Sequence, residues 1–105
     1  MSELPVGGHV TVRAKAMERV FAALAADSLG VDPHRVAARV TDERGAVSVD
    51  VVGPVASRRE GTVMDAAARA RERVGAEGSS ITGATIGAVR IRITEFDTST
   101  RRRVA

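Results

Sequence analysis

The 105-residue chain contains no cysteine, tryptophan or tyrosine, and only two phenylalanines. The lack of cysteine excludes a disulfide framework and thiolate metal sites. Because aromatic residues are scarce, the core of this single domain must be built from Val, Ile, Leu and Ala, and we expect it to be thin. A thin core often leaves part of the stability to a partner subunit, so self-association is expected.

Long apolar segments are also missing. The longest purely apolar run, residues 20–26, is far shorter than the ~20 residues that cross a bilayer. Residues 1–5 lack the basic segment followed by an apolar one that a secretory signal requires. We therefore expect a cytoplasmic protein with no direct membrane insertion.

Basic charge is concentrated near the C-terminus. Residues 1–83 carry as many basic as acidic side chains, so the whole net charge of +3 lies in residues 84–105. Residues 97–105 predict a basic tail, which is either a solvated end, a contact for an anionic surface or a docking strand for a partner. The candidate contacts for a partner or an anion are Arg39, Arg90, Arg92, Arg101, Arg102 and Arg103.

The first helix is predicted over residues 12–29. Residues 1–10 contain one proline and the pair Gly7-Gly8, and they predict a loose leader. Apolar residues then recur at helical spacing, with Lys15, Arg19, Ala22 and Ala26 on the other side of the helix. Gly30 suits the left-handed residue that ends many helices, and Asp32-Pro33 predicts a turn.

Alternating apolar residues predict three strands. Residues 36–41 and 47–51 alternate on either side of the turn at residues 42–45, which indicates a β-hairpin. Gly53-Pro54 predicts the end of the second strand, because proline lacks an amide hydrogen. Residues 89–93 predict the third strand.

The second helix is predicted to begin at Thr62, which with Asp65 resembles a capping box. Its predicted buried stripe is Val63, Ala67, Ala70 and Val74. Gly75 and Gly78 are expected to weaken its C-terminal end.

These elements predict one α+β domain over residues 11–96, in the order α-β-β-α-β. Each strand has one apolar and one polar face, so we expect a two-layer, KH-like sandwich with both helices on the same face of a three-stranded sheet. The order of the strands is left open. The uncovered face would display Arg39, Thr41, Ser48, Asp50, Arg90 and Arg92.

Residues for catalysis or cofactor binding are sparse. The only histidines, His9 and His34, lie in predicted loops with no cluster of carboxylates nearby, whereas a metal needs three or four converging ligands. The serines lack the glycine-framed turn of an activated nucleophile. Glu60 and Asp65 flank a helix start, where acidic side chains favour the helix dipole. The sequence therefore predicts neither an enzyme nor a cofactor.

The stretch Gly75-Ala76-Glu77-Gly78 admits an alternative function. A Gly-x-x-Gly loop after a helix is how KH domains clamp a sugar-phosphate backbone. The alternative is thus a KH-like nucleic-acid module, in which Arg90, Arg92 and the tail arginines contact phosphate. Glu77 disfavours it, because its carboxylate would repel phosphate.

Several segments together resemble the alkaline shock protein family, whose members are small envelope or general stress response proteins. The resemblance is carried by residues 12–20, Leu29-Gly30-Val31, residues 47–51, the Ala/Arg/Val helix at residues 66–74, Thr82-Gly83 and residues 89–93. It covers about residues 11–93.

The resemblance implies a noncatalytic, cytoplasmic protein prone to self-assembly. In some members a separate anchoring protein holds the chain at the membrane. We therefore expect a homo-oligomer, or a complex with a paralogue or a membrane-anchor protein. From the residues, the predicted self-association face is the outer side of the first helix, at Arg19, Ala22 and Ala26.

Overall fold

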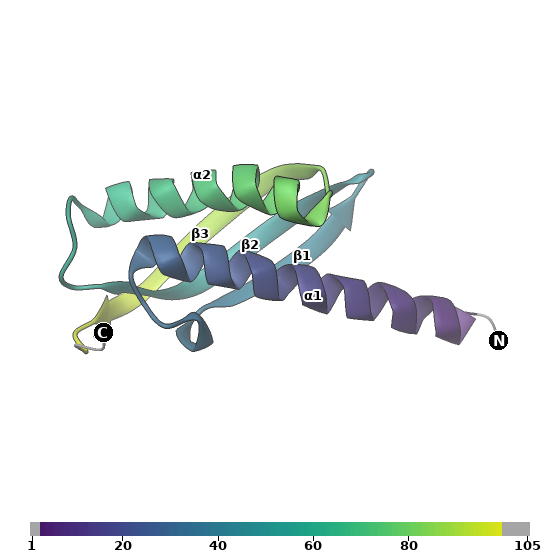
Figure 1. The fold of residues 1–105 in the computed structure, drawn as a ribbon, viewed down its shortest axis with the longest axis horizontal. Helices are drawn as coiled ribbons and strands as arrows, with labels where there is room; N and C mark the ends of the chain where they lie inside the picture. The colour runs from purple at the N-terminus through teal and green to yellow at the C-terminus, as the bar shows by residue number, and fades with distance from the viewer. Residues whose placement is uncertain (1–2, 100–105) are drawn as a thin grey trace.

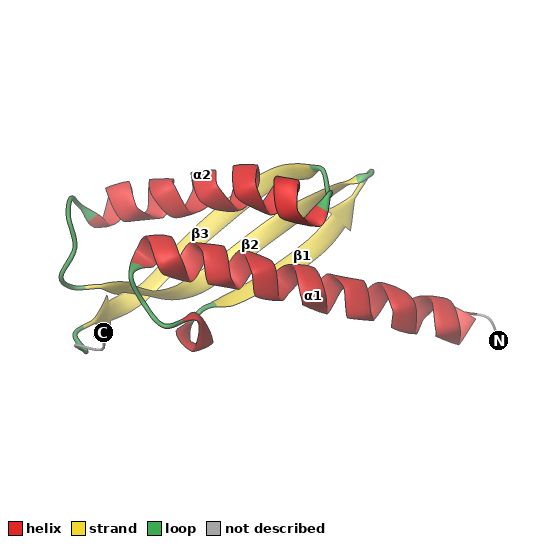
Figure 2. Cartoon of the chain, viewed as in Figure 1, coloured by secondary structure: helices red, strands yellow, loops and turns green. Residues whose placement is uncertain are grey.

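The computed structural model describes the backbone of residues 3–99 and the side chains of residues 13–99. The elements are α1 (Glu3–Leu29), the short 3-10 helix η1 (Pro33–Arg35), β1 (Ala37–Glu43), β2 (Ala46–Ala56), α2 (Val63–Thr82) and β3 (Ile86–Asp97). The predicted order α-β-β-α-β and the α+β class are confirmed. Both helices lie on one face of the sheet, as predicted (Figures 1 and 2).

The sheet is mixed, with β2 in the centre of the order β1-β2-β3. β1 and β2 form the predicted antiparallel hairpin, whereas β2 and β3 run parallel. A parallel pair needs a long crossover connection, and α2 supplies it. The strand order, which the sequence left open, is therefore fixed by the β2-α2-β3 unit, and both β1 and β3 are edge strands.

The hairpin turn consists of Arg44 and Gly45, which both have positive φ angles of 55° and 84°. Two consecutive left-handed residues make the turn whose twist matches that of the flanking strands. Glycine adopts this conformation without steric cost, so Gly45 fixes the register in which Glu43 pairs with Ala46.

The first helix starts earlier than the sequence suggests. α1 begins at Glu3, so the prediction of a loose leader over residues 1–10 is wrong for the described residues 3–10. Proline is tolerated in the first helical turn, because its missing amide hydrogen has no helical acceptor there. Each glycine in Gly7-Gly8 costs about 1 kcal/mol relative to alanine, which weakens a helix without forbidding it.

The second strand also continues past its predicted end. β2 runs through Gly53-Pro54 to Ala56, so the predicted break is wrong. Pro54 is accommodated because it has no paired residue in either neighbour: the ladder with β1 stops at Val52, and the ladder with β3 shifts register between Gly53 and Val55. At such a position no ladder hydrogen bond is lost.

The predicted capping box at the start of α2 is confirmed. The Asp65 amide donates to the Thr62 hydroxyl at 3.0 Å, and the Thr62 amide donates to the Asp65 carboxylate at 2.9 Å. These two amides would otherwise lack partners in the first turn. The hydrogen bond from the Thr62 amide, followed by that with the Thr62 side chain, lowers the pKa of Asp65.

The buried stripe of α2 is Ala66, Ala70, Val74 and Gly78, and it differs from the predicted one in that Val63 and Ala67 are only half-buried. Gly78 permits a close approach between the helices. A Cβ atom at this position would lie 2.7 Å from Cε1 of Phe21. Gly78, which was expected to weaken the end of α2, therefore makes room for the buried ring of Phe21. The helix continues past it to Thr82.

The core lies between the helices and the sheet. Its largest fully buried side chains are Phe21, Leu29, Val49, Val51, Val55 and Val74. Among the described side chains no polar or charged residue is buried. Apart from Phe21, the core is thus the aliphatic, alanine-lined layer that the composition predicts.

Candidate interaction surface

The uncovered face of the sheet carries a row of charges. Arg39 of β1, Asp50 of β2 and Arg90 of β3 are in register across the three strands. Arg90 Nε lies 3.5 Å from Asp50 Oδ1. The next residue on this side of β3, Arg92, is paired with Val52 and is exposed. We call these five residues, Arg39, Asp50, Val52, Arg90 and Arg92, the open face.

A hollow of about 410 Å³ lies along the open face and the adjoining β1 edge. Its lining carries the three arginines of the open face against only two carboxylates, Asp50 and Glu18. The hollow therefore favours anionic groups, and its charges are displayed to solvent rather than converging in a closed pocket.

The β1 edge of the sheet is closed by a side chain from α1. Glu18 Oε2 accepts a hydrogen bond of 3.0 Å from the backbone amide of Val40 in the middle of β1. A charged side chain on an edge strand blocks pairing with another strand. This role has no signal in the sequence, because Glu18 resembles any solvated helix residue and its hydrogen bond with Val40 joins segments far apart in the chain.

A second groove, of about 530 Å³, separates α1 from η1 and β1. It contains two residues of the predicted self-association face, Arg19 and Ala22, together with Lys15, Glu18, Pro33, His34, Val36, Ala37 and Ala38. The third predicted residue, Ala26, is fully buried, so placing it on an outer face was wrong. α1 packs on both α2 and the sheet, and its buried stripe therefore widens here to include Ala25 and Ala26.

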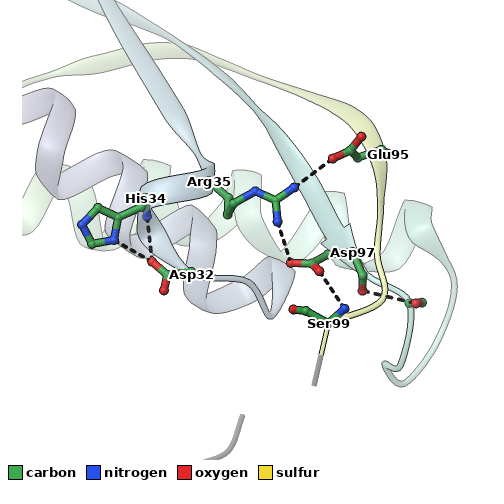
Figure 3. A network of polar contacts seen from close by, with 7 residues as sticks. Asp32, His34, Arg35, Glu95, Asp97 and Ser99 are labelled. Atoms are coloured by element: carbon green, nitrogen blue, oxygen red, sulfur yellow. Dashed lines mark hydrogen bonds and ion pairs between the residues drawn. The ribbon is translucent and has the colours of Figure 1, made fainter. Parts of the chain in front are cut away.

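The C-terminal end of β3 is held by a polar network (Figure 3). Arg35 donates to Glu95 at 2.8 Å and to Asp97 at 3.3 Å. Asp97 also accepts a hydrogen bond from the Ser99 amide, and its backbone carbonyl accepts from Ser57. Arg35 thus joins the segment before β1 to the far edge strand. This role of Arg35 could not be predicted from the sequence, because contacts between distant segments leave no local pattern.

His34 belongs to the turn after α1. Its Nδ1 lies 2.8 Å from Asp32 Oδ1, and its backbone amide donates to the same oxygen (Figure 3). Its ring is almost fully exposed, so this contact is part of the turn and not of an enclosed site. The side chain of His9 lies outside those that the structure describes.

The two helices are joined by Arg73. Its guanidinium donates to Asp27 of α1 and, at 3.2 Å, to Glu77 one turn further along α2. These hydrogen bonds, first that to Asp27, raise the pKa of Arg73.

Among the candidate carboxylates, Asp65 is hydrogen-bonded in the helix cap, and Glu60 is exposed near it in the chain.

Among side chains 13–99, three large apolar ones are exposed, namely Met64 and Ile81 on α2 and Phe96 on β3. The guanidinium carbon of Arg59 lies 5.6 Å from the centre of the Phe96 ring, which is within the range of a cation–π contact. Met64 and Ile81 lie near opposite ends of α2, so these two side chains do not share one patch.

The Gly75–Gly78 stretch lies inside α2, so the loop that the KH-like alternative requires is absent there. Within the described residues no three His, Asp or Glu side chains gather as a metal-binding group. None of the helices over residues 3–99 has the length and apolar character needed to span a bilayer. Arg101, Arg102 and Arg103 lie outside the described residues.

The chain was compared with family models, with curated proteins and with solved structures, and none of them matches it.

Proposed function

We propose that this chain is a noncatalytic scaffold of the envelope or general stress response, which self-associates in the cytoplasm and docks a protein partner. The resemblance to the alkaline shock protein family supplies the class of role. The partner would be a paralogue or a membrane-anchor protein. Support from the fold comes from the length of α1 relative to the sheet that it covers.

α1 extends far beyond the sheet. The helix has 27 residues, which correspond to roughly 40 Å at 1.5 Å per residue. Its C-terminal half packs on α2 and the sheet, while its N-terminal half projects past the strands (Figure 1). The molecule is accordingly 50 Å long but only 23 Å wide.

An isolated helical segment is marginal in water, because most helical stability in proteins comes from packing against other elements. The projecting half also contains Pro5, Gly7 and Gly8, which lower its intrinsic helicity. Contact with a second chain would stabilise it. This is the observation that supports self-association, and it moves the proposed contact from Arg19, Ala22 and Ala26 to the projecting half of α1.

Light scattering of the full chain over a range of concentrations tests the assembly. We expect a mass above that of the monomer, which falls towards the monomer in Val10→Pro, because proline removes the backbone hydrogen bond to the preceding turn. The control Val10→Ala keeps the helix and should keep the assembly. A wild-type monomer at every concentration would contradict the proposal, and so would a Val10→Pro variant that assembles like wild type.

The KH-like nucleic-acid module is the weaker alternative. With residues 75–78 inside α2, a clamp for the sugar-phosphate backbone would have to be built from the open face and from Arg101, Arg102 and Arg103. Binding of single-stranded RNA that weakens steeply with salt would favour it over the scaffold, because phosphate contacts release counterions.

A further inference from the structure

The free edge of β3 is the longest unpaired strand edge among the described residues. β3 has 12 residues and pairs on one side only, with β2. On its other side no described segment is hydrogen-bonded as a strand. An edge strand presents a row of unpaired N–H and C=O groups, which is a template for an added strand.

The opposite edge of the sheet is built differently. β1 has seven residues, and the amide of Val40 in its middle is already bonded to Glu18. α1 and η1 line the groove beside it. A strand added to β1 would have to displace the Glu18 carboxylate, whereas a strand added to β3 would displace no described side chain from a backbone group. The two edges therefore differ, and β3 is the accessible one.

The side chains of β3 define what an added strand must carry. Val89, Ile91 and Ile93 are half-buried against the core, and Arg90 and Arg92 alternate with them on the open face. In a sheet, side chains directly opposite on adjacent strands interact. Residues opposite the arginines would gain from negative charge, and those on the helix-covered side would gain from apolar character.

The open face leaves positive charge uncompensated. Asp50 lies beside Arg90, and Arg92 has no carboxylate partner among the described side chains. An acidic residue on a neighbouring strand would lie next to Arg92, where opposite charges are stabilising.

A second copy of β3 fits this edge poorly. An antiparallel β3–β3 pair centred on Ile91 would place Arg90 of each copy opposite Arg92 of the other. Like charges directly opposite are destabilising. In this register the arginines oppose pairing between two copies, whereas they attract an acidic strand.

We propose that the β3 edge docks an extended segment of a partner protein in which acidic residues alternate with apolar ones. The segment adds a fourth strand, with its carboxylates beside Arg90 and Arg92 and its apolar side chains continuing the row of Val89, Ile91 and Ile93. This inference rests on the proposed function in that it assigns a place to partner docking, but it does not depend on self-association.

The test uses a labelled peptide of the length of β3 in which glutamate alternates with valine, and its affinity for the full chain is measured by fluorescence anisotropy. The variant Arg90→Glu/Arg92→Glu should weaken binding by about tenfold or more, because two attractive cross-strand pairs become repulsive. A peptide in which lysine replaces glutamate should show the reverse preference. The control Arg58→Glu/Arg71→Glu makes the same change of net charge at exposed positions away from the open face, and it should bind nearly as wild type does.

A second peptide, in which glutamate alternates with proline, separates strand addition from simple charge attraction, because proline cannot donate to a ladder. It should bind much more weakly. Amide exchange should slow at alternate residues of β3 when the glutamate-valine peptide is added, and not in β1. Both double variants should keep the far-UV circular dichroism of wild type, which shows that they fold.

The proposal is overturned if the glutamate-valine peptide does not bind, or if the glutamate-proline peptide binds with the same affinity. It is overturned as well if the control Arg58→Glu/Arg71→Glu loses as much affinity for the glutamate-valine peptide as Arg90→Glu/Arg92→Glu does. It is also overturned if the β3 amides become protected with rising protein concentration alone, because a second copy would then occupy the edge. Val10→Pro should still bind the peptide. A wild-type chain that stays monomeric at every concentration but binds the peptide would refute the scaffold's self-association and leave the docking edge intact.

Discussion

The two sides of the sheet are used differently. On the helix-covered side, Phe21, Val49, Val51 and Val74 are at most 1% exposed and fill the space between the layers. On the open face, the Arg90 side chain is 79% exposed and makes only a long contact with Asp50. Because a stable core needs only one side of an antiparallel or mixed sheet, the other side is free to carry charge for recognition. The helix-covered side should therefore determine stability, and the open side should contribute little to it.

The largest expected effect is that of Phe21→Ala on the helix-covered side. Phe21 is fully buried, and removal of its ring should lower the free energy of unfolding by roughly 3–5 kcal/mol. Denaturation by urea measures the change. Phe96→Ala is the matched control, because Phe96 is 59% exposed. Equal losses for the two variants would contradict the assignment of stability to the covered side.

The two glycines of the Gly75–Gly78 stretch provide a sharper comparison within one helix. Gly78→Ala places a Cβ atom 2.7 Å from the buried Phe21 ring and should destabilise the fold by about 1–3 kcal/mol. Gly75→Ala meets no atom within 4 Å and should stabilise α2 by up to about 1 kcal/mol through helix propensity. Urea denaturation of both variants measures the difference. If both substitutions changed the free energy of unfolding in the same direction, the close contact between Gly78 and Phe21 would be contradicted.

The capping box at the start of α2 should have an intermediate effect. Thr62→Ala removes the acceptor of the Asp65 amide and should cost about 1 kcal/mol. Thermal unfolding near neutral pH measures it, with Thr62→Ser as the control that keeps a hydroxyl acceptor. A Thr62→Ser variant as unstable as Thr62→Ala would contradict the role of the cap.

The same cap predicts a dependence on pH. The Thr62 amide lowers the pKa of Asp65 below the usual 3.8, so its stabilisation is present above pH 3.8 and is lost as the pH falls through the folded-state value. The difference in unfolding free energy between wild type and Asp65→Asn should therefore be largest near neutral pH and shrink in acid. A difference that grows as the pH falls would have the wrong sign for this carboxylate.

The smallest effect is expected on the open face. Arg92→Ala removes an exposed side chain that has no ion pair with the described residues, and it should change the unfolding free energy by less than about 0.5 kcal/mol. Urea denaturation checks this. A decrease in unfolding free energy as large as that of Phe21→Ala would mean that the open face contributes substantially to stability.

What could be predicted from the sequence was mostly local. The cap at Thr62 depends on residues three apart and is predicted from the pattern alone. The hairpin is predicted as well, but its turn is shorter than the expected residues 42–45, because β1 continues to Glu43. The predicted start of the first helix and the predicted end of the second strand at Gly53-Pro54 are wrong. The effect of a proline or glycine depends on its position in the helix or sheet, which the local sequence does not show. Pro5 falls in the first helical turn, and Pro54 falls where neither adjacent strand needs its amide.

The interaction surface was predictable only in part. Alternation placed Arg39, Arg90 and Arg92 on the uncovered face, but the register that brings Arg39 and Arg90 beside Asp50 required the strand order. Ala26 was placed on the wrong side, because a helical stripe does not reveal how many elements the helix touches. The closure of the β1 edge by Glu18 joins residues that are 22 positions apart and follows from tertiary packing alone.

Amide hydrogen exchange of the free chain at low concentration tests the asymmetry of the sheet most directly. The amides of β2 that pair with β1 or β3 should exchange only on global unfolding, and the Val40 amide should be slowed by its bond to Glu18. Every second amide of β3 should exchange far faster than those of β2, because it faces the free edge. Uniformly slow exchange along the whole of β3 in the monomer would contradict an open docking edge.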